Sequence, residues 1–567
     1  MKKIILIIIL LFLTIEVKAT SNVIDITSLT MEEIIDYLDK GVITSEKLVQ
    51  LYLDRINNFN NDYKAIITIN NNILEEARLS DTLRKENKKR GILEGVPILV
   101  KDNIDVYGMP TTGGSNVLSD NYPLQDAEVI KIIKDNGGLI IAKTNMSMFA
   151  LSARNSCSNY GCVSNPFKLG YTSYGSSGGS ATALALAFGS IALGTDTNSS
   201  VRLPAASSGL VGLRVSTGNF STSGVMPYDS NRDTIGIISR TVNDAKILYN
   251  IINAPKEVTN KEINIGIPNN LINNYFLKTN LEELLNKLKE SNINIVYIDN
   301  YNTSKVNSYA YNSMSGYTMC KAFNTYLEGT TSKITNFKEL SNRVPILYDY
   351  YKICNYTNND ISRTSNNRNK LKEYIDNLYQ EYNLDYLLYP TNNNEIYLNS
   401  EEKLNNSNTR ISPTLGYPAL SMPYTKYNDF YYSIEILGKK DNEDNLLNVA
   451  SIIENIINLE RYSLNRLYEV DKDDQELLKM YMDNYNNKNK EEWLNKVSNY
   501  FINNEGSKEK LIDDYYTLQK ELSLSKKTIE YKKHDDTFIL LLLTLLYSLL
   551  PFYIKMKRGR INGIRNS

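Results

Sequence analysis

Apolar positions at helical spacing alternate with short apolar runs through the first half of the chain. Thr30 and Glu33 form a capping box, and apolar residues follow them at three- and four-residue spacing, which predicts a helix. Residues 127–134 have the same helical spacing. Short apolar runs at 98–100 and 138–143 predict buried strands. An alternation of helices and strands of this kind predicts an α/β fold.

The second half of the chain has a weaker pattern. Residues 252–380 are rich in Asn and Tyr, and their pattern assigns no role. Apolar runs return at 384–390 and 431–437, which predict two further strands, and residues 445–457 have the spacing of a helix. We therefore expect one large folded domain over residues 20–462.

Both ends of the chain carry apolar runs. Residues 1–19 begin with two lysines after Met1, continue with an apolar stretch and have a small residue at the cleavage position, which is typical of a secretory signal peptide; an uncleaved membrane anchor is the alternative. Residues 538–554 contain no charge and are long enough for one transmembrane helix, with a buried core helix as the alternative. The basic residues of 555–567 predict a cytoplasmic tail. We expect a single-pass membrane protein whose main domain lies outside the cytoplasm.

Residues 463–537 differ in composition from the domain before them. They are charged and helix-like, with Gly506 as their one glycine. Leu511, Tyr515 and Leu518 fall near heptad spacing, which is typical of a short coiled coil or of one packed helix face. We interpret the segment as a membrane-proximal helical stalk, which would support a homodimer if it forms a coiled coil.

Charge and cysteine content exclude several kinds of partner. The chain has 63 Lys and Arg against 64 Asp and Glu, so no general basic field favours nucleic acid. Its four cysteines have no histidine near them, and we expect neither a zinc site nor any other metal or cofactor. Buried or free thiols are the simplest interpretation, and a Cys157–Cys162 disulfide is the alternative for an exported protein.

Residues 175–204 carry the most informative motif. A turn rich in glycine and serine leads into a run of small residues, and a second serine-rich turn follows. The single histidine, His534, lies beside the C-terminal apolar run, so a Ser-His-Asp hydrolase is close to excluded. A reactive serine here needs another base, and lysine is suited to this when burial keeps it neutral. Lys101 ends a predicted buried strand and is the candidate, with a snorkelling surface lysine as the alternative.

The chain resembles the amidase signature family over residues 24–462. The resemblance rests on ordered motifs, namely GVP leading to KDN at 95–103, GSSGGS at 175–180, GTDT leading to SVRLP at 194–204, and GLVGLR at 209–214. The run 223–236 is similar to the branch with peptide amidases; the A-type subunit of glutamyl-tRNA amidotransferase and fatty acid amide hydrolase are more distant. The resemblance implies a mixed central β-sheet with helices on both faces.

The resemblance also implies roles for individual residues. The implied catalytic residues are the nucleophile Ser200, the bridging serine Ser176 after a cis peptide bond, and the base Lys101. The implied oxyanion hole consists of the backbone N–H groups of Thr197, Asn198, Ser199 and Ser200. Supporting residues are Ser177, Asp196 and Arg202, of which the last two also fit a structural ion pair.

The loop before the implied nucleophile departs from the family pattern. Relatives usually carry glycine directly before the nucleophile, whereas this chain has Asn198 and Ser199. Asparagine tolerates a positive φ better than most residues, and serine does so less readily. Ser199 therefore bears on the geometry of the loop, and with it on the rate or the size of the substrate, and the complete triad favours activity.

The leading hypothesis is a membrane-tethered amidase that hydrolyses the carboxamide of a small molecule or peptide. A lipid amide hydrolase is one alternative within the same fold. Part of a complex that acts on a charged transfer RNA is another, which the signal peptide and the balanced charge disfavour. A catalytically inactive binding protein is the third, and Ser199 is its motivation.

Overall fold

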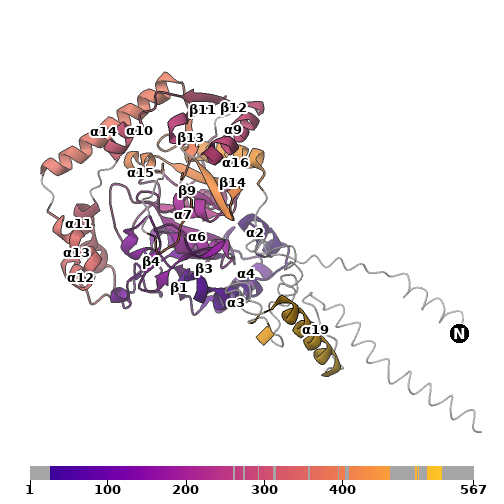
Figure 1. The fold of residues 1–567 in the computed structure, drawn as a ribbon. Coiled ribbons are helices and arrows are strands. Elements are labelled where there is room, and N and C mark those ends of the chain that lie inside the picture. The colour runs from indigo at the N-terminus through magenta and orange to yellow at the C-terminus, as the bar shows by residue number, and fades with distance from the viewer. Residues whose placement is uncertain are drawn as a thin grey trace, which may run out of the picture. The chain divides into compact units, whose positions relative to one another are not determined.

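The fold is described from a computed structural model of the chain (Figure 1). The chain divides into two compact units, Asp25–Met482 and a unit made of Met1–Ile24 with Asp483–Ser567. The structure describes residues 26–258, 262–272, 275–291, 293–310, 315–355, 358–393, 395–401, 408–459, 492–493, 496 and 507–525.

An eleven-stranded sheet forms the centre of the larger unit, in the order β1-β3-β2-β8-β10-β9-β14-β15-β13-β11-β12. The strands, in this order, are Ile66–Ile69, Leu139–Thr144, Pro97–Lys101, Ile191–Thr195, Ile235–Ser239, Val211–Arg214, Ala419–Tyr427, Phe430–Leu437, Tyr386–Pro390, Ile263–Pro268 and Ile293–Ile298. Strand β2 is parallel to β3 and β8, and β11 is parallel to β12 and β13, whereas the other neighbours are antiparallel. The predicted mixed sheet is confirmed.

Helices cover both faces of this sheet. Strands β2, β3, β8, β9, β10, β13 and β15 bury every residue, and because side chains alternate between the two faces, both faces must be covered. The α-helices that the structure describes in this unit are α2 (Met31–Asp39), α3 (Ser45–Tyr63), α4 (Ile73–Lys85), α5 (Glu128–Asp135), α6 (Gly178–Ala185), α7 (Arg202–Ser207), α8 (Val242–Ile252), α9 (Tyr275–Glu290), α10 (Thr303–Ala310), α11 (Ser315–Glu328), α12 (Phe337–Arg343), α13 (Pro345–Lys352), α14 (Asn358–Glu381), α15 (Ile411–Leu415) and α16 (Glu443–Ile457).

Local signals placed the elements of the first half accurately. The Thr30 hydroxyl accepts the Glu33 N–H at 3.0 Å, and the Glu33 carboxylate accepts the Thr30 N–H at 2.8 Å, so the capping box is present. The strands expected at 98–100 and 138–143 are β2 and β3, and the helix expected at 127–134 is α5. The prediction of an α/β fold is confirmed by this alternation.

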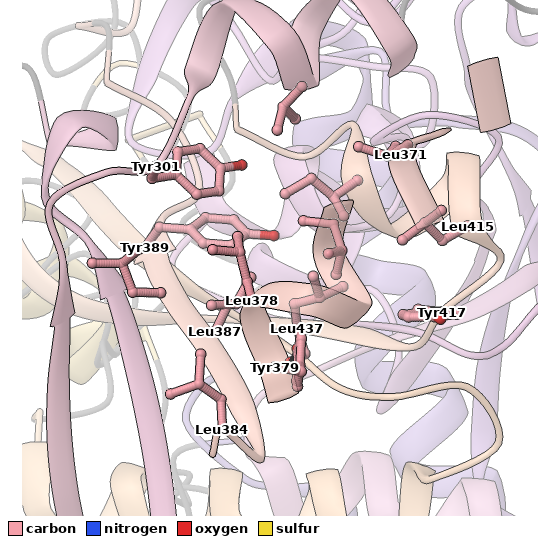
Figure 2. Close-up of a cluster of buried hydrophobic side chains, with 14 of the residues drawn as sticks. Tyr301, Leu371, Leu378, Tyr379, Leu384, Leu387, Tyr389, Leu415, Tyr417 and Leu437 are labelled. Atoms are coloured by element: carbon pink, nitrogen blue, oxygen red, sulfur yellow. Dashed lines mark hydrogen bonds between the residues drawn. The ribbon is translucent and has the colours of Figure 1, made fainter. Parts of the chain in front are cut away.

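The stretch 252–380, which the pattern left unassigned, contributes to two hydrophobic clusters. Helices α11, α12 and α13 bury apolar side chains against Phe149 and Met226 from the first half of the chain, and they form one group in Figure 1. Helices α10 and α14 bury theirs in a second cluster with Tyr389 and Leu415 (Figure 2). The region therefore completes the core of the larger unit.

The interpretation of the cysteines as free thiols is wrong. Cys157 and Cys162 lie directly opposite each other in the hairpin of β4 (Cys157–Ser158) and β5 (Gly161–Cys162), and they form a disulfide. Cys320 on α11 is bonded to Cys354, which follows α13. Because the chain has four cysteines, all of them are paired. A second hairpin, β6 (Ser164–Asn165) with β7 (Lys168–Thr172), follows the first.

The predictions for the chain ends fall largely beyond the described residues. The signal peptide at 1–19, the transmembrane helix at 538–554 and the basic tail at 555–567 all lie outside them. No helix within the described ranges is both long and apolar enough to span a membrane. Of the predicted stalk, α19 (Lys508–Ser525) is described, and the Leu511 carbonyl accepts the Trp493 indole N–H at 2.7 Å.

Candidate active site

Two neighbouring strand ends place a lysine beside a threonine. Lys101 is the last residue of β2 and Thr195 the last of β8, and these parallel strands end at the same edge of the sheet. The Lys101 ammonium lies 2.7 Å from the Ser176 hydroxyl, 2.7 Å from the Thr195 hydroxyl and 3.3 Å from the Thr195 carbonyl. Lys101 is fully buried, so the alternative of a snorkelling surface lysine is wrong.

Burial changes the protonation of this lysine. It lowers the pKa of Lys101 from 10.5 to about 7, although the negative charges of Asp196 and Asp233 act in the opposite direction. The three groups that face the ammonium are two hydroxyls and one carbonyl, which carry no charge. At neutral pH, a substantial fraction of Lys101 is therefore an amine that can accept a proton.

Ser177 joins the two serine-rich turns. Its N–H donates to the Ser200 carbonyl at 3.1 Å, and its hydroxyl lies 3.3 Å from both the N–H and the carbonyl of Thr195. The peptide bond between Gly175 and Ser176 is cis, as the resemblance implies. The hydroxyls of Ser176 and Ser200 share no hydrogen bond within the described part of the chain.

Close approach of neighbouring groups explains two of the motif glycines. A Cβ on Gly179 would lie 2.1 Å from the Asn145 carbonyl oxygen, which is backbone and cannot move aside. A Cβ on Gly194 would lie 2.8 Å from the Ser177 hydroxyl. Both residues thus let the serine turn lie against the strand ends, which is the reason for glycine at these positions.

The loop that carries Ser200 presents a row of unused donors. The N–H groups of Thr197, Asn198, Ser199 and Ser200 donate no hydrogen bond to any residue that the structure describes. The side chains hold the loop instead: the Thr197 hydroxyl donates to Asp233 at 2.6 Å, and the Asn198 side-chain oxygen accepts from Arg232 at 2.9 Å. Burial raises the pKa of Asp233 to about 6.

Ser199 fits the loop without a strained backbone. Neither Asn198 nor Ser199 has a positive φ, so the loop adopts a backbone that ordinary L-residues accept. Ser199 is almost completely buried, and its carbonyl accepts the N–H of Leu203 at 2.9 Å as α7 begins. The loop therefore accommodates a side chain where relatives usually have glycine.

Asp196 and Arg202 belong to a larger buried ion network. The Arg202 guanidinium donates to Asp196 at 3.1 Å and to Glu435 at 2.6 Å, and also to the Asn198 carbonyl at 2.8 Å and the Thr409 carbonyl at 3.0 Å. Arg214 donates to both the carbonyl and the carboxylate of Asp196. Burial raises the pKa of Asp196, but the two arginines outweigh it and hold that pKa below its usual value. The structural ion pair is confirmed, and it ties the loop that carries Ser200 to β15.

Several residues of the site were not singled out from the sequence. Thr195, Asn103, Arg214 and Asp233 stand inside the family motifs, and Asn103 donates to the Thr195 hydroxyl at 3.0 Å. A sequence signal did exist for Glu435, because it is the one acidic residue in the apolar run of β15. Among the described residues, no group of three or more His, Cys, Asp or Glu side chains is placed to hold a metal ion.

Known proteins are similar to this chain in sequence. The A-type subunit of glutamyl-tRNA(Gln) amidotransferase from Saccharolobus solfataricus is 28% identical over 472 residues, which is 74% of this chain and 95% of that protein. The corresponding protein of Salinibacter ruber is 38% identical over 232 residues, 41% of this chain and 45% of that protein.

Solved structures show the same architecture. Peptide amidase from Stenotrophomonas maltophilia superimposes with a TM-score of 0.69 at 23% identity, over 76% of this chain and 98% of that one. An amidase family protein from Bacillus anthracis gives a TM-score of 0.67 at 26% identity, over 77% and 92%. The family model Amidase matches residues 47–447, most of the chain. The resemblance inferred from the motifs is thereby confirmed, and the chain belongs to the amidase family of enzymes.

Proposed function

We propose that this chain hydrolyses a carboxamide through an acyl-enzyme formed on Ser200. The observation that carries the proposal is the buried contact of Lys101 with Ser176 at 2.7 Å, together with the pKa of Lys101 near 7. A hydroxyl attacks an amide slowly unless a base removes its proton, and a neutral lysine can be that base.

The reaction follows from the order of the groups. Lys101 takes the Ser176 proton, Ser176 takes the Ser200 proton, and the Ser200 oxygen bonds to the carbonyl carbon. The C–N bond then breaks, and the leaving amine receives the proton back through Ser176. Water repeats the sequence and releases the acid. The hydrogen bond between Ser176 and Ser200 forms in the substrate complex, because such contacts are often long without substrate.

The donors of the nucleophile loop would stabilise the tetrahedral intermediate. The N–H groups of residues 197–200 make no hydrogen bond among the described residues, so they are available to an oxyanion. One donor of this kind is worth roughly 10²–10³ in rate. Because the loop is built without a positive φ at Ser199, we favour an active enzyme over the inactive alternative.

The alternatives differ in substrate rather than in site. Relatives carry the name of an amidotransferase, and the balanced charge of this chain argues against a transfer RNA substrate. A lipid amide would need an apolar acyl pocket. A panel of peptide amides, short acyl amides and fatty acid amides separates these classes by their values of kcat/KM.

A serine-directed fluorophosphonate probe tests the catalytic proposal. We expect labelling of the folded wild type, no labelling of Ser200→Ala, and strongly slowed labelling of Lys101→Ala. Ser223→Ala, which alters an exposed serine, is the control and should label normally. A folded wild type that takes no label would refute the proposal.

We also propose that the amidase domain lies outside the cytoplasm, held by the apolar segment 538–554. The two disulfides support an oxidising compartment, since such bonds are rare in the cytosol. External protease on intact cells should degrade the domain and spare the basic tail. Full protection of the domain in cells whose surface marker is digested would contradict this placement.

A further inference from the structure

A disulfide joins the first and last helices of the group α11–α13 (Figure 1). Cys320 lies on α11, and Cys354 follows α13 at a separation of 34 positions. Both cysteines are partly exposed, so a small thiol can reach the bond between them. Their sulfur atoms lie 3.9 and 3.6 Å from the Tyr350 carbonyl oxygen, which places the bond against the backbone of α13. The disulfide therefore holds α11 and α13 together at one point.

Both of these helices contact Tyr228. The Thr318 hydroxyl on α11 lies 3.5 Å from the Tyr228 carbonyl oxygen. The Tyr350 ring on α13 packs edge to face against the Tyr228 ring, with 6.1 Å between the ring centroids, and the two hydroxyls are 3.4 Å apart. Each of the two contacts lies within about one helical turn of a cysteine, so the disulfide fixes the two contacts relative to each other.

Tyr228 is connected in turn to the loop that carries Ser200. Its N–H donates to the Asp233 carboxylate at 2.8 Å, and the N–H of Asp229 donates to the same carboxylate oxygen at 2.9 Å. The other oxygen of Asp233 accepts the Thr197 hydroxyl at 2.6 Å. A displacement of Tyr228 would therefore move Asp233 and with it Thr197, whose N–H is one of the proposed oxyanion donors.

Short helices and apolar contacts hold the group α11–α13 in place. Helix α12 has seven residues and α13 has eight, and helices of this length are unstable alone in water. The group packs on Phe149 and Met226 through apolar contacts, which are not directional. A cross-link between residues 34 positions apart restricts the chain between them. We therefore expect α11 and α13 to move more independently once the disulfide is cleaved.

We propose that the Cys320–Cys354 disulfide is a redox switch that sets the position of the loop carrying Ser200: the oxidised pair keeps the site active, and reduction by a thiol loosens α11–α13 and slows catalysis. This inference rests on the proposed amidase function and adds a means of regulation to it. The contacts that transmit the change run from the disulfide through Tyr350, Tyr228 and Asp233 to Thr197.

The reduction is an exchange between thiols and a disulfide. A thiolate of a small dithiol attacks one sulfur of the pair, and the other cysteine leaves as a thiolate that takes up a proton. The second thiol of the reductant then closes a disulfide within the reductant and releases the first cysteine. Two electrons and two protons thus pass from the dithiol to the cysteine pair.

Dithiothreitol added to the purified full-length chain tests the switch. Alkylation and mass spectrometry follow the reduction of each cysteine pair, while kcat and KM are measured for amide hydrolysis. We expect kcat to fall about tenfold as the Cys320–Cys354 pair is reduced, within the range typical of coupling between two sites, with little change in KM because the oxyanion donors act in the transition state. Unchanged kcat after complete reduction of this pair would overturn the inference. A fall in kcat that accompanies loss of the far-ultraviolet circular dichroism signal would mean global unfolding and overturn it as well.

Two double variants locate the effect. Cys157→Ala with Cys162→Ala removes the other disulfide, which closes five positions within a hairpin whose strands are already paired. This variant should respond to dithiothreitol as wild type does. Cys320→Ala with Cys354→Ala should start at the low kcat of the reduced enzyme and respond no further. The opposite pattern would assign the response to the hairpin and refute the switch.

Tyr350→Ala interrupts the contacts and leaves the disulfide in place. It should lower kcat about as far as reduction does, and reduction should then have little further effect. Tyr351→Ala is the matched control, because Tyr351 is the next residue of α13 and packs against the same hydrophobic cluster. This control should lower the urea midpoint without lowering kcat. Equal losses of kcat in both variants would show a general packing role and overturn the inference.

Hydrogen exchange separates this inference from the proposed function. The N–H groups of Tyr228 and Asp229 are protected from exchange by their hydrogen bonds to Asp233. Reduction should speed exchange in a peptide over residues 226–234 and leave a peptide over β2 unchanged. Faster exchange upholds the coupling even if no amide is hydrolysed. If wild type hydrolyses amides and reduction changes neither kcat nor this exchange, the switch is refuted and the amidase function stands.

Discussion

Two buried lysines stand at the ends of adjacent parallel strands and have different surroundings. Lys101 ends β2, and Lys143 is next to last in β3, where it pairs with Val100. Both side chains are fully buried, and burial lowers the pKa of each. Desolvation alone therefore does not distinguish a catalytic base from a structural cation.

The partners of the two ammonium groups make the distinction. Both ammonium groups donate to uncharged groups, Lys143 to the Thr111 hydroxyl at 2.9 Å and the Pro110 carbonyl at 3.2 Å. Lys143 in addition lies 3.6 Å from the carboxylate of Asp102, and the charge of Asp105 also favours its protonated form. The Asp102 carboxylate accepts the N–H groups of Thr112 and Gly114 and so holds the loop after β2. Neutral partners let a buried lysine lose its proton, and anionic partners keep the charge in place.

Lys101→Met should produce the largest effect, because it removes the base and preserves the volume of the side chain. We expect a loss of kcat of about 10⁴-fold, as for members of other catalytic units. Single-turnover amide hydrolysis by the purified domain measures it. Retention of more than a tenth of the activity would mean that Lys101 is not the base.

The same variant tests the linkage between Lys101 and stability. Its folded pKa is near 7 and its unfolded value near 10.5, so the unfolded state binds more protons between these pH values. The contribution of Lys101 to the free energy of unfolding of the wild type therefore rises as pH rises from 7 to 10.5. Below pH 7 the full cost of burying the charged Lys101 applies. Lys101→Met should gain more stability over wild type at pH 6 than at pH 9 in urea unfolding.

Lys143→Met should act on stability instead of on chemistry. It leaves Asp102 buried without its cation, and breaking a buried pair in this way costs about 3–5 kcal/mol. The urea midpoint at pH 7 is the measurement, with Lys101→Met as the matched variant. If the two variants lose equal stability, the contrast between the two lysines is wrong.

Thr195→Val tests how the uncharged hydrogen-bond partners of Lys101 affect its pKa. Its hydroxyl accepts a hydrogen bond from the Lys101 ammonium at 2.7 Å, so its removal disfavours the charged form and lowers the pKa of Lys101 further below about 7. The acid limb of kcat/KM against pH should move about one pH unit lower, because one charge-assisted hydrogen bond is worth at least that much. Thr144→Val is the control, since its hydroxyl meets Ser180 at 2.7 Å. An acid limb that moves to higher pH would contradict the assignment.

Elements that depend on interactions between nearby residues could be predicted from the sequence, whereas contacts between distant residues could not. Capping at Thr30 and the apolar runs of β2 and β3 act over a few residues, and these elements were predicted closely. The contact of Arg202 with Glu435 spans 233 positions, so no local pattern indicated it. Helix α14 lies in the unassigned region, and it is mostly polar with one buried stripe, a weak signal in a segment rich in Asn.

The candidate triad was a different case. Lys101 and Ser176 lie 75 positions apart, and their pairing came from the motifs of a family, together with the need for a base in a chain with one histidine.

Tyr326→Phe should give the smallest effect of these variants, and it tests the charged surroundings of Lys143. The Tyr326 hydroxyl on α11 donates to Asp105 at 2.8 Å, beside Lys143, and losing it should cost about 1–2 kcal/mol. Burial raises the pKa of Asp105 from 3.8 to about 6, so the folded state binds more protons between these values and stability falls as pH rises through them.

The Tyr326 hydroxyl favours the charged form of Asp105, so its removal raises this pKa further and extends the unfavourable window upward. The loss in urea midpoint should therefore be larger at pH 7.5 than at pH 4.5, with kcat/KM unchanged. Tyr350→Phe offers the control, because Tyr350 meets the neutral hydroxyl of Tyr228 at 3.4 Å and its loss should not depend on pH. A loss of stability in Tyr326→Phe that does not depend on pH would show that Asp105 carries no charge beside Lys143. The surroundings of Lys101 and Lys143 would then differ less than their contacts imply.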